Sequence, residues 1–418
     1  MAVVGEEAYD DRVSDDGLTL RTLTTDDLPA FATMLARAFL TDDTEGVRFR
    51  EALVFEPERS HGVFDGNELI GTGELLTRRI TVPGAGQTPL AAVTSVGVAP
   101  GHRRRGALTR VMRAQLHGLH EDGGEPIAAL WASEATIYPR FGYGLAAQFH
   151  RAKVRAKSAF RPGVELETER VREIARAEAI PLIKAIYEKE AQLRVGALDR
   201  PGPAWEFNLD DREVRHKGSS GMKFAVLPDG YAIYRVKSDW DEEGPRGTLS
   251  LQELVATTPR TYATLYRFLL DYDLIGTIEL NAALDEPLVH LLADPRKMTR
   301  SAGDSLWLRL VDVDRGLVTR RYGAPVDLVF GVRDTFCPWN TGNWRLVTDA
   351  DGNAEVTRVE DAPDLELGVD DLGAIFLGGT RPSTLAAAGR IKERTAGAVS
   401  RATAAFATDR EPSCLESF

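Results

Sequence analysis

The spacing of hydrophobic residues in the first part of the chain switches between two periods. Short alternating or continuous apolar runs predict strands, and apolar residues at every third or fourth position predict helices. The expected strands are 18–23, the two arms of a hairpin within 62–79, 93–98 and 128–132, and the expected helices are 28–39 and 106–119. This mixture of strands and helices predicts an α/β (α+β) fold class, beginning with a domain at residues 1–150.

Similar patterns continue through the rest of the chain, with two shifts in composition. A Glu- and Arg-rich helix expected at 171–191 begins a second region, whose strands and helix repeat the element order of the first. From Leu306 onward, leucines alternate with Trp307 and Arg309, as in a strand with two different faces, and we expect a third region to begin there. Further expected elements are the strands 231–237, 249–255 and 326–332 and the helices 261–273 and 383–395. The expected domains are therefore 1–150, 151–304 and 305–418.

Length and charge narrow the classes of function. The chain has 418 residues, which at roughly 150 residues per domain agrees with about three domains. Asp and Glu number 63 against 51 Lys and Arg, giving a formal charge of -12, and this argues against a nucleic-acid partner. A cationic small-molecule substrate suits the negative charge better.

The sequence also predicts where the protein works. The amino terminus is acidic, with Glu6, Glu7 and Asp10 among its first residues, and it lacks the apolar stretch of a secretion signal. No apolar run reaches the roughly 18 residues that cross a bilayer, so no membrane partner is expected. The chain's two cysteines, Cys337 and Cys414, suit a reducing compartment. We expect a cytoplasmic protein.

Several polar residues are candidate functional groups. The seven histidines lack the short paired spacing of a zinc site, so no metal is expected, and His117 and His120 are expected on a solvated helix face. Cys414 is a candidate reactive thiol. Asp42 and Asp43 follow the first helix, and they either help to bind a cationic acceptor or are solvated loop charges.

The strongest chemical signal is the segment TSVGVAPGHRRRGAL at 94–108. Here a strand leads into Arg103, Arg104, Arg105 and Gly106, which open a helix. A helix start offers unpaired N–H groups and partial positive charge, and the arginines add full charges, so a pyrophosphate fits there. The strand edge at 96–98 can hydrogen-bond an extended chain that contains amides.

This pattern resembles the acetyl-coenzyme A motif of the GNAT acetyltransferases. Together with SEATIYPRFGYG at 133–144 and a carboxyl-terminal phenylalanine, it is similar to the Eis family. The resemblance implies two GNAT-like domains in tandem, the second without a pyrophosphate motif, then a sterol-carrier-like domain whose carboxyl terminus reaches the active site. It further implies acetyl-CoA as cosubstrate and a homohexamer.

The resemblance also assigns roles to residues. Val96 and Val98 are implied to offer backbone groups to the pantetheine arm, and Tyr138 is implied to be the general acid and the Phe418 carboxylate the general base. The implied cofactor-binding residues are Val96, Val98, Arg103, Arg104, Arg105, Gly106, Ala107, Leu108 and Ser133. The family commonly has Gly or Ala where Leu108 stands, and an acidic residue where Ser417 stands.

The expected function is acetyl transfer to primary amines of cationic small molecules, with aminoglycosides as the class that the resemblance suggests. Direct attack needs a base for the amine and an acid for the thiolate. A terminal carboxylate, with a pKa of roughly 3.3 to 3.7, is a weak base, so part of its role is electrostatic. Two alternatives remain open: a protein lysine N-acetyltransferase, and a lipid- or sterol-binding carrier with a degenerate GNAT domain.

Overall fold

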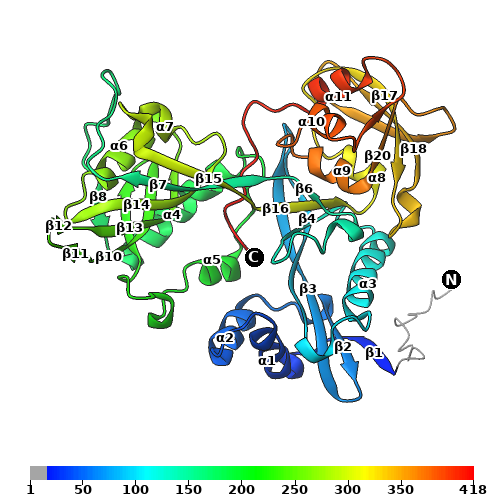
Figure 1. Ribbon diagram of the computed structural model, residues 1–418, viewed down its shortest axis with the longest axis horizontal. Helices are drawn as coiled ribbons and strands as arrows, with labels where there is room; N and C mark the ends of the chain where they lie inside the picture. Colours follow the sequence, from blue (N-terminus) through cyan, green and yellow to red (C-terminus); the bar gives the residue numbers. More distant parts are fainter. Residues whose placement is uncertain (1–16) are drawn as a thin grey trace.

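The computed structural model describes residues 17–418, and the acidic amino-terminal residues on which the expected absence of a secretion signal depends lie outside this range. Two seven-stranded sheets and one five-stranded sheet organise the described chain. Figure 1 shows the second sheet on the left, the first sheet at the centre and the smaller third sheet at the upper right. None of the helices in 17–418 is long and apolar enough to span a membrane.

The first sheet has the strand order β1-β2-β3-β4-β5-β16-β6. Its strands are β1 (Leu18–Thr22), β2 (Ser60–Asp65), β3 (Glu68–Val82), β4 (Gly86–Val98), β5 (Ile127–Trp131), β6 (Gly144–Leu145) and β16 (Leu306–Leu310). The helices α1 (Leu28–Ala38), α2 (Thr44–Val54) and α3 (Ala107–Asp122) pack on it. These elements confirm the helices and strands expected before residue 133 within a few residues at each end, except that β4 begins at Gly86, well before the expected residue 93.

The second sheet has the order β15-β7-β14-β13-β10-β9-β8. Its strands are β7 (Gln148–Arg155), β8 (Arg172–Ile174), β9 (Lys223–Leu227), β10 (Gly230–Lys237), β13 (Gly247–Ala256), β14 (Ile275–Ala283) and β15 (Met298–Asp304), and a small ribbon joins β11 (Trp240–Asp241) to β12 (Gly244–Pro245). Its helices are α4 (Arg176–Ala191), α5 (Gly202–Asn208), α6 (Pro259–Leu270) and α7 (Leu288–Leu291). The expected helix at 171–191 is wrong at its start, because residues 172–174 pair with β9 as an edge strand.

The third sheet has the order β19-β18-β17-β20-β21. Its strands are β17 (Val326–Arg333), β18 (Gly342–Thr348), β19 (Ala354–Val359), β20 (Leu365–Gly368) and β21 (Lys392–Glu393), with helices α8 (Val313–Leu317), α9 (Val369–Ile375), α10 (Pro382–Ala387) and α11 (Ala398–Phe406). The helix expected at 383–395 ends early at Ala387, and Gly389, with φ of +75°, turns the chain toward β21.

Strand β16, expected to open the third domain, instead lies in the first sheet between β5 and β6. Leu306 pairs with Trp131 and Leu310 with Ile127 in an antiparallel ladder, a long-range pairing that local periodicity does not reveal. Behind it, Gly144 lies so close to the α9 backbone that an added Cβ would collide with the carbonyl oxygen of Asp370. One hydrophobic core therefore runs from the first sheet into the third, and fixes the third domain against the first.

Candidate functional site

Strands β4 and β5 separate partway along the first sheet. Their parallel pairing comprises Ala91 with Ala128 and Ala92 with Ala129, while β4 continues to Val98. Strand β3 borders this extension on the other side, where Gly71 pairs with Val98. Residues 93–98 therefore present a backbone edge toward the gap, and the expected site residues Val96 and Val98 lie half-buried along it.

A bulge interrupts β4 within this open stretch. The register against β3 shifts between Thr72 and Glu74, and Ser95 takes a φ of +50°, which is uncommon for a residue other than glycine. The Thr72 hydroxyl donates a 2.8 Å hydrogen bond to the carbonyl oxygen of Ser95 and holds the bulge. Backbone strain of this kind, which costs of order 1–3 kcal/mol, concentrates at ligand sites.

The arginine turn joins β4 to α3 beside this edge. Arg104 has a φ of +65° and Gly106 a φ of +83°, so the chain passes twice through the left-handed region. Gly106 is the N-cap of α3 without a side-chain cap, and an added Cβ there would meet nothing within 4 Å. The first N–H groups of α3 are thus open to an anionic ligand.

The side chains of this turn divide into two groups. Arg103 and Arg104 are exposed, whereas the Arg105 guanidinium pairs with Asp65 at 2.5 Å and holds the turn against the β2–β3 hairpin. Ala107 is buried in one hydrophobic cluster and Leu108 packs against a neighbouring one, so these two residues offer only backbone groups. Two free guanidinium groups beside an uncapped helix start suit the charge of a pyrophosphate.

Tyr138 lies in the loop that follows β5, the strand on the other side of the gap from β4. Its side chain is buried, its ring meets that of Tyr143 edge-on at 6.2 Å, and the Ser133 side chain lies near its hydroxyl. Burial raises the pKa of Tyr138, and the exposed Glu134 adds to this, while the nearby Ser133 side chain opposes it. The phenol therefore keeps its proton at neutral pH, as a general acid must.

The carboxyl terminus reaches the bulged strand. The Thr94 hydroxyl donates a 2.9 Å hydrogen bond to a terminal oxygen of Phe418, and the Phe418 side chain is partly buried against the main core. Figure 1 shows the last segment, in red, descending between the first and second sheets to this point. The chain's last carboxylate thus lies beside the residue at which the open edge of β4 begins.

A buried ion cluster anchors this tail. The Glu416 carboxylate accepts hydrogen bonds from Arg78 of β3 at 2.8 Å, from Arg200 of the second domain at 2.5 Å and from the Asn208 amide at 3.1 Å. Burial alone would raise the pKa of Glu416, but the charges and hydrogen bonds of the two arginines bring it below its usual value. Because Arg200 also pairs with Glu253 on β13, the cluster ties both sheets to the tail.

Sequence reasoning missed a carboxyl group next to the bulge. Glu51 of α2 accepts a 3.0 Å hydrogen bond from the Ser95 hydroxyl, and burial raises its pKa. On β3, Glu74 is buried, and burial followed by the charge of Glu51 raises its pKa well above the usual value. The signal for Glu74 was an acid inside an apolar strand, whereas nothing in the polar helix α2 distinguished Glu51 from its neighbours.

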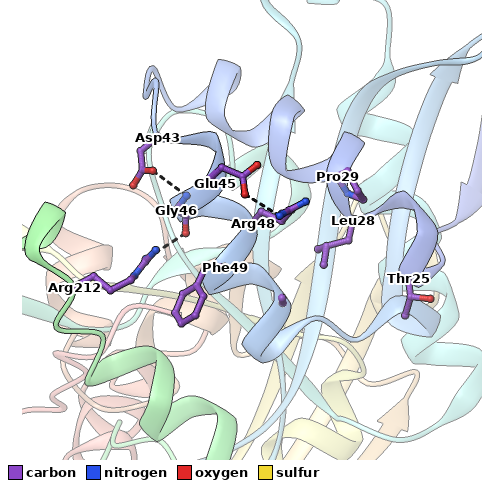
Figure 2. Close-up of a pocket in the computed structure, with 10 residues that line it drawn as sticks. Thr25, Leu28, Pro29, Asp43, Glu45, Gly46, Arg48, Phe49 and Arg212 are labelled. Carbon is purple, nitrogen blue, oxygen red and sulfur yellow. Dashed lines mark hydrogen bonds and ion pairs between the residues drawn. The ribbon is translucent and has the colours of Figure 1, made fainter.

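The candidate Asp43 does not face the gap. Figure 2 shows it at the start of α2, where its carboxylate accepts a 2.9 Å hydrogen bond from the Gly46 N–H. It lines a cavity of about 630 Å³ between α1, α2 and Arg212, whose guanidinium lies over the Phe49 ring at 4.3 Å and pairs with Asp210. Asp43 is therefore an exposed, solvated charge, as one of the two alternatives expected, and it also caps α2.

Two other candidates are affected by packing. Burial raises the pKa of Cys414 to about 12, so this thiol is not the reactive group that was considered. His120 stacks on Trp339 of the third domain at 4.1 Å and lies 2.5 Å from the Asp312 carboxylate, and His117 meets the same ring edge-on. The expected solvated face is confirmed in part: His120 stays exposed, whereas Trp339 of the third domain packs against one side of both rings. Residues 17–418 contain no group of three or more potential metal-binding side chains.

Comparisons with known proteins agree with this architecture. Residues 19–146 and 196–310 each match the family model of an acetyltransferase (GNAT) domain, and residues 313–415 match a sterol carrier protein domain. An uncharacterized N-acetyltransferase of Streptomyces avermitilis is 41% identical over 405 residues, covering 94% of this chain and 98% of that protein. N-acetyltransferase Eis of Mycobacterium tuberculosis is 37% identical over 354 residues, covering 83% and 85%.

Solved structures show the same arrangement. The crystal structure of Eis1 from Mycobacterium abscessus superposes with a TM-score of 0.83 at 33% identity, covering 96% of this chain and all (100%) of that one. A GCN5-related N-acetyltransferase from Anabaena variabilis, 21% identical, superposes with a TM-score of 0.81 over 96% of this chain and 100% of its own, which shows a shared fold.

Proposed function

Because the chain belongs to the Eis-like GNAT N-acetyltransferases, with two GNAT domains followed by a sterol-carrier-like domain, we propose that it transfers acetyl from acetyl-CoA to primary amines of cationic small molecules. The family confirms the fold class and the enzyme class expected from the arginine turn. The proposal concerns the donor, the acceptor and the residues that act on them.

The donor site is proposed in the gap between β4 and β5. The N–H groups at the start of α3, with Arg103 and Arg104, hold the pyrophosphate, and the free edge at Val96 and Val98 receives the pantetheine amides. Ser133 lies at the far side of the gap beside Tyr138. Acetyl-CoA, when bound there, supplies an acetyl group on a thiol leaving group.

The observation that carries the mechanism is the hydrogen bond from Thr94 to the terminal carboxylate of Phe418. This carboxylate accepts a proton of the acceptor amine, directly or through water, while a C–N bond forms and the C–S bond breaks. Tyr138 gives its phenolic proton to the departing thiolate, a transfer that is uphill by about 2 kcal/mol at ordinary pKa values. The phenol is reprotonated from solvent.

The acceptor is proposed to be cationic because two carboxyl groups converge on the bulge. The Phe418 carboxylate accepts a hydrogen bond from Thr94, and the Glu51 carboxylate accepts one from Ser95. Thr94 and Ser95 are consecutive residues, so their Cα atoms are about 3.8 Å apart. An ammonium group entering there would meet the terminal carboxylate, and its charge would favour the ionised form of Glu51 against the effect of burial. By family resemblance, we propose aminoglycosides as the class of acceptor. We also propose that the protein is a cytoplasmic homohexamer, and light scattering would measure the mass of this assembly.

The test measures coenzyme A thiol released from acetyl-CoA with a panel of aminoglycosides and simpler amines. The native chain is compared with one extended by three residues after Phe418, which moves the carboxylate and changes no side chain. We expect turnover by the native chain and loss of most kcat in the extended one. Equal activity would remove Phe418 from the mechanism. Activity on histone-like peptides but on no small amine would favour a protein lysine acceptor, and bound lipid without coenzyme A binding would favour the carrier function.

A further inference from the structure

The second domain contains a cavity at the place that corresponds to the donor site of the first. Strand β13 runs parallel to β14 from Gly247 to Leu251, then continues to Ala256 beyond that pairing. The register of β13 against β10 shifts at Gln252, as that of β4 against β3 does near Ser95. A cavity of about 550 Å³ occupies the resulting gap, and we call it the second cavity.

The second cavity is not built for a pyrophosphate. Helix α6 begins at Pro259, which has no N–H group, and the Thr258 side chain already accepts the N–H of Thr261. The nearby Arg260 guanidinium pairs with Glu165. The N–H groups that would bind an anion at the start of α3 have no open counterpart at the start of α6. A ligand of the second cavity is therefore expected to lack a pyrophosphate group.

The charges around the second cavity favour a cation. Five carboxyl groups and three guanidinium groups line it: Glu190, Glu253, Asp285, Glu286 and Glu416, with Arg194, Arg200 and Arg410. All three arginines are paired, Arg194 and Arg410 with Asp285 and Arg200 with Glu253 and Glu416. Glu190 and Glu286 form no ion pair within residues 17–418, although the charges of Arg194 and Arg410 act on both from a greater distance.

The two carboxyl groups lie among aromatic and apolar side chains. Tyr262 and Tyr266 both donate their hydroxyl groups to Oε1 of Glu286, the latter at 3.1 Å, and their rings lie 4.8 Å apart. Burial raises the pKa of Glu286 to about 7, so it ionises near neutrality. Leu254 and Leu291 add apolar surface to the lining. The lining thus combines carboxyl groups, ring faces and an apolar wall.

We propose that the second cavity binds a small molecule that carries a primary ammonium group on an apolar body, with Glu190 and Glu286 receiving the ammonium group. The proposal is independent of acetyl transfer. Residues 413–416 of the tail form one wall of the second cavity, and Glu416 belongs to the ion cluster that anchors Phe418. The ligand therefore contacts the segment that ends in the donor site.

The test is calorimetric titration with phenethylammonium as the probe, in the presence of saturating coenzyme A. The chain extended after Phe418 is titrated in parallel, so that binding at the acetyl-acceptor site is recognised by its loss. We expect one binding event that survives the extension and that Glu190→Gln or Glu286→Gln weakens about tenfold or more. Glu188→Gln, on the exposed side of the same helix, serves as the control and should bind normally.

The neutral probe 2-phenylethanol should bind at least tenfold more weakly to the native chain, because it brings no charge to the carboxylates. The proposal is overturned if phenethylammonium fails to bind at millimolar concentration, or if both glutamine variants bind it as the native chain does. Circular dichroism of each variant checks that the fold is retained, and the comparison with the native chain is made with whichever glutamine variant is folded.

Discussion

The hydroxyl of Thr94 donates a hydrogen bond to the carboxylate of Phe418 across 324 residues of sequence. One partner lies on the bulged strand of the first domain and the other is the last residue of the chain. The third domain and the buried cluster at Glu416 hold this end of the chain where the open edge of β4 begins. A carboxylate that every chain possesses thereby acquires a specific place.

We predict that Thr94→Val lowers kcat about tenfold and leaves the KM for acetyl-CoA unchanged. A hydrogen bond to a charged group contributes about 1.5–3 kcal/mol, and its loss lets the carboxylate move away from the acceptor amine. Steady-state kinetics measures the effect. Thr88→Val, the same substitution at a buried position of the same strand, should behave as the native chain does. Equal rates for the two variants would show that Thr94 does not position the carboxylate.

We predict that Tyr138→Phe lowers kcat about a hundredfold, since general acid catalysis typically contributes two to four orders of magnitude. Coenzyme A binding, measured by titration, should not change. The matched control is Tyr143→Phe, because the Tyr143 hydroxyl is fully buried and has no hydrogen-bond partner in the described chain. Losing that hydroxyl should leave activity intact. If both variants lost activity equally, packing of the aromatic loop would explain the effect better than proton transfer.

The elements around the proposed donor site were predictable because their signals are local. The strand before Pro100, the arginine turn and the amphipathic helix lie within some 30 consecutive residues, and each element follows from periodicity or from the demands of a helix start. The motif around Tyr138 comes soon afterwards in the sequence, at 133–144. Here the order of residues along the chain and their proximity in space coincide, so the sequence pattern was sufficient.

The remaining features depend on contacts between distant segments. Nothing around Glu416 indicates that Arg78 and Arg200 surround it, and the leucines of β16 alternate in the same way whichever sheet they join. The polar face of α3 gives no sign that Trp339 of the third domain stacks on His120, although that histidine stays exposed. Periodicity reports that a face is buried or polar, but not which partner covers it.

We predict that Glu416→Gln destabilises the protein by about 3 kcal/mol and lowers kcat, because it removes one charge from a buried cluster and leaves two arginines partly unpaired. Urea unfolding measures the first effect. Carboxypeptidase digestion measures release of the tail, which should be faster in the variant. Leu415→Ser is the control, since its side chain is 44% exposed and contributes little to the anchor. Unchanged digestion would mean that other contacts hold the tail.

We predict that the double variant Arg103→Ala/Arg104→Ala raises the KM for acetyl-CoA tenfold or more with little change in kcat. Both guanidinium groups are exposed beside the uncapped start of α3 and would contact the pyrophosphate. S-acetylpantetheine, which lacks the pyrophosphate, is the control substrate, and its kinetics should not change. Equal losses with both substrates would point to a damaged turn rather than to lost phosphate contacts.

Glu286 should make stability depend on pH in the neutral range. Burial raises its pKa in the folded chain from 4.5 to about 7, with the Leu288 N–H and the charges of Arg194 and Arg410 acting in the opposite direction. A group whose pKa is raised by folding contributes its full stability at pH values below its pKa in the unfolded chain. This contribution is lost as the pH rises through its pKa in the folded chain. The loss between about pH 4.5 and 7 amounts to roughly 3 kcal/mol.

Glu286→Gln removes this titration and keeps an oxygen for Tyr262 and Tyr266. Between pH 5 and pH 8 the free energy of unfolding should therefore fall by about 2–3 kcal/mol more in the native chain than in the variant. Urea denaturation at four pH values measures this difference, and Glu188→Gln should follow the native curve. Parallel curves for the native chain and Glu286→Gln would mean that the carboxyl group is already ionised in the folded protein, because water or a neighbouring charge reaches it.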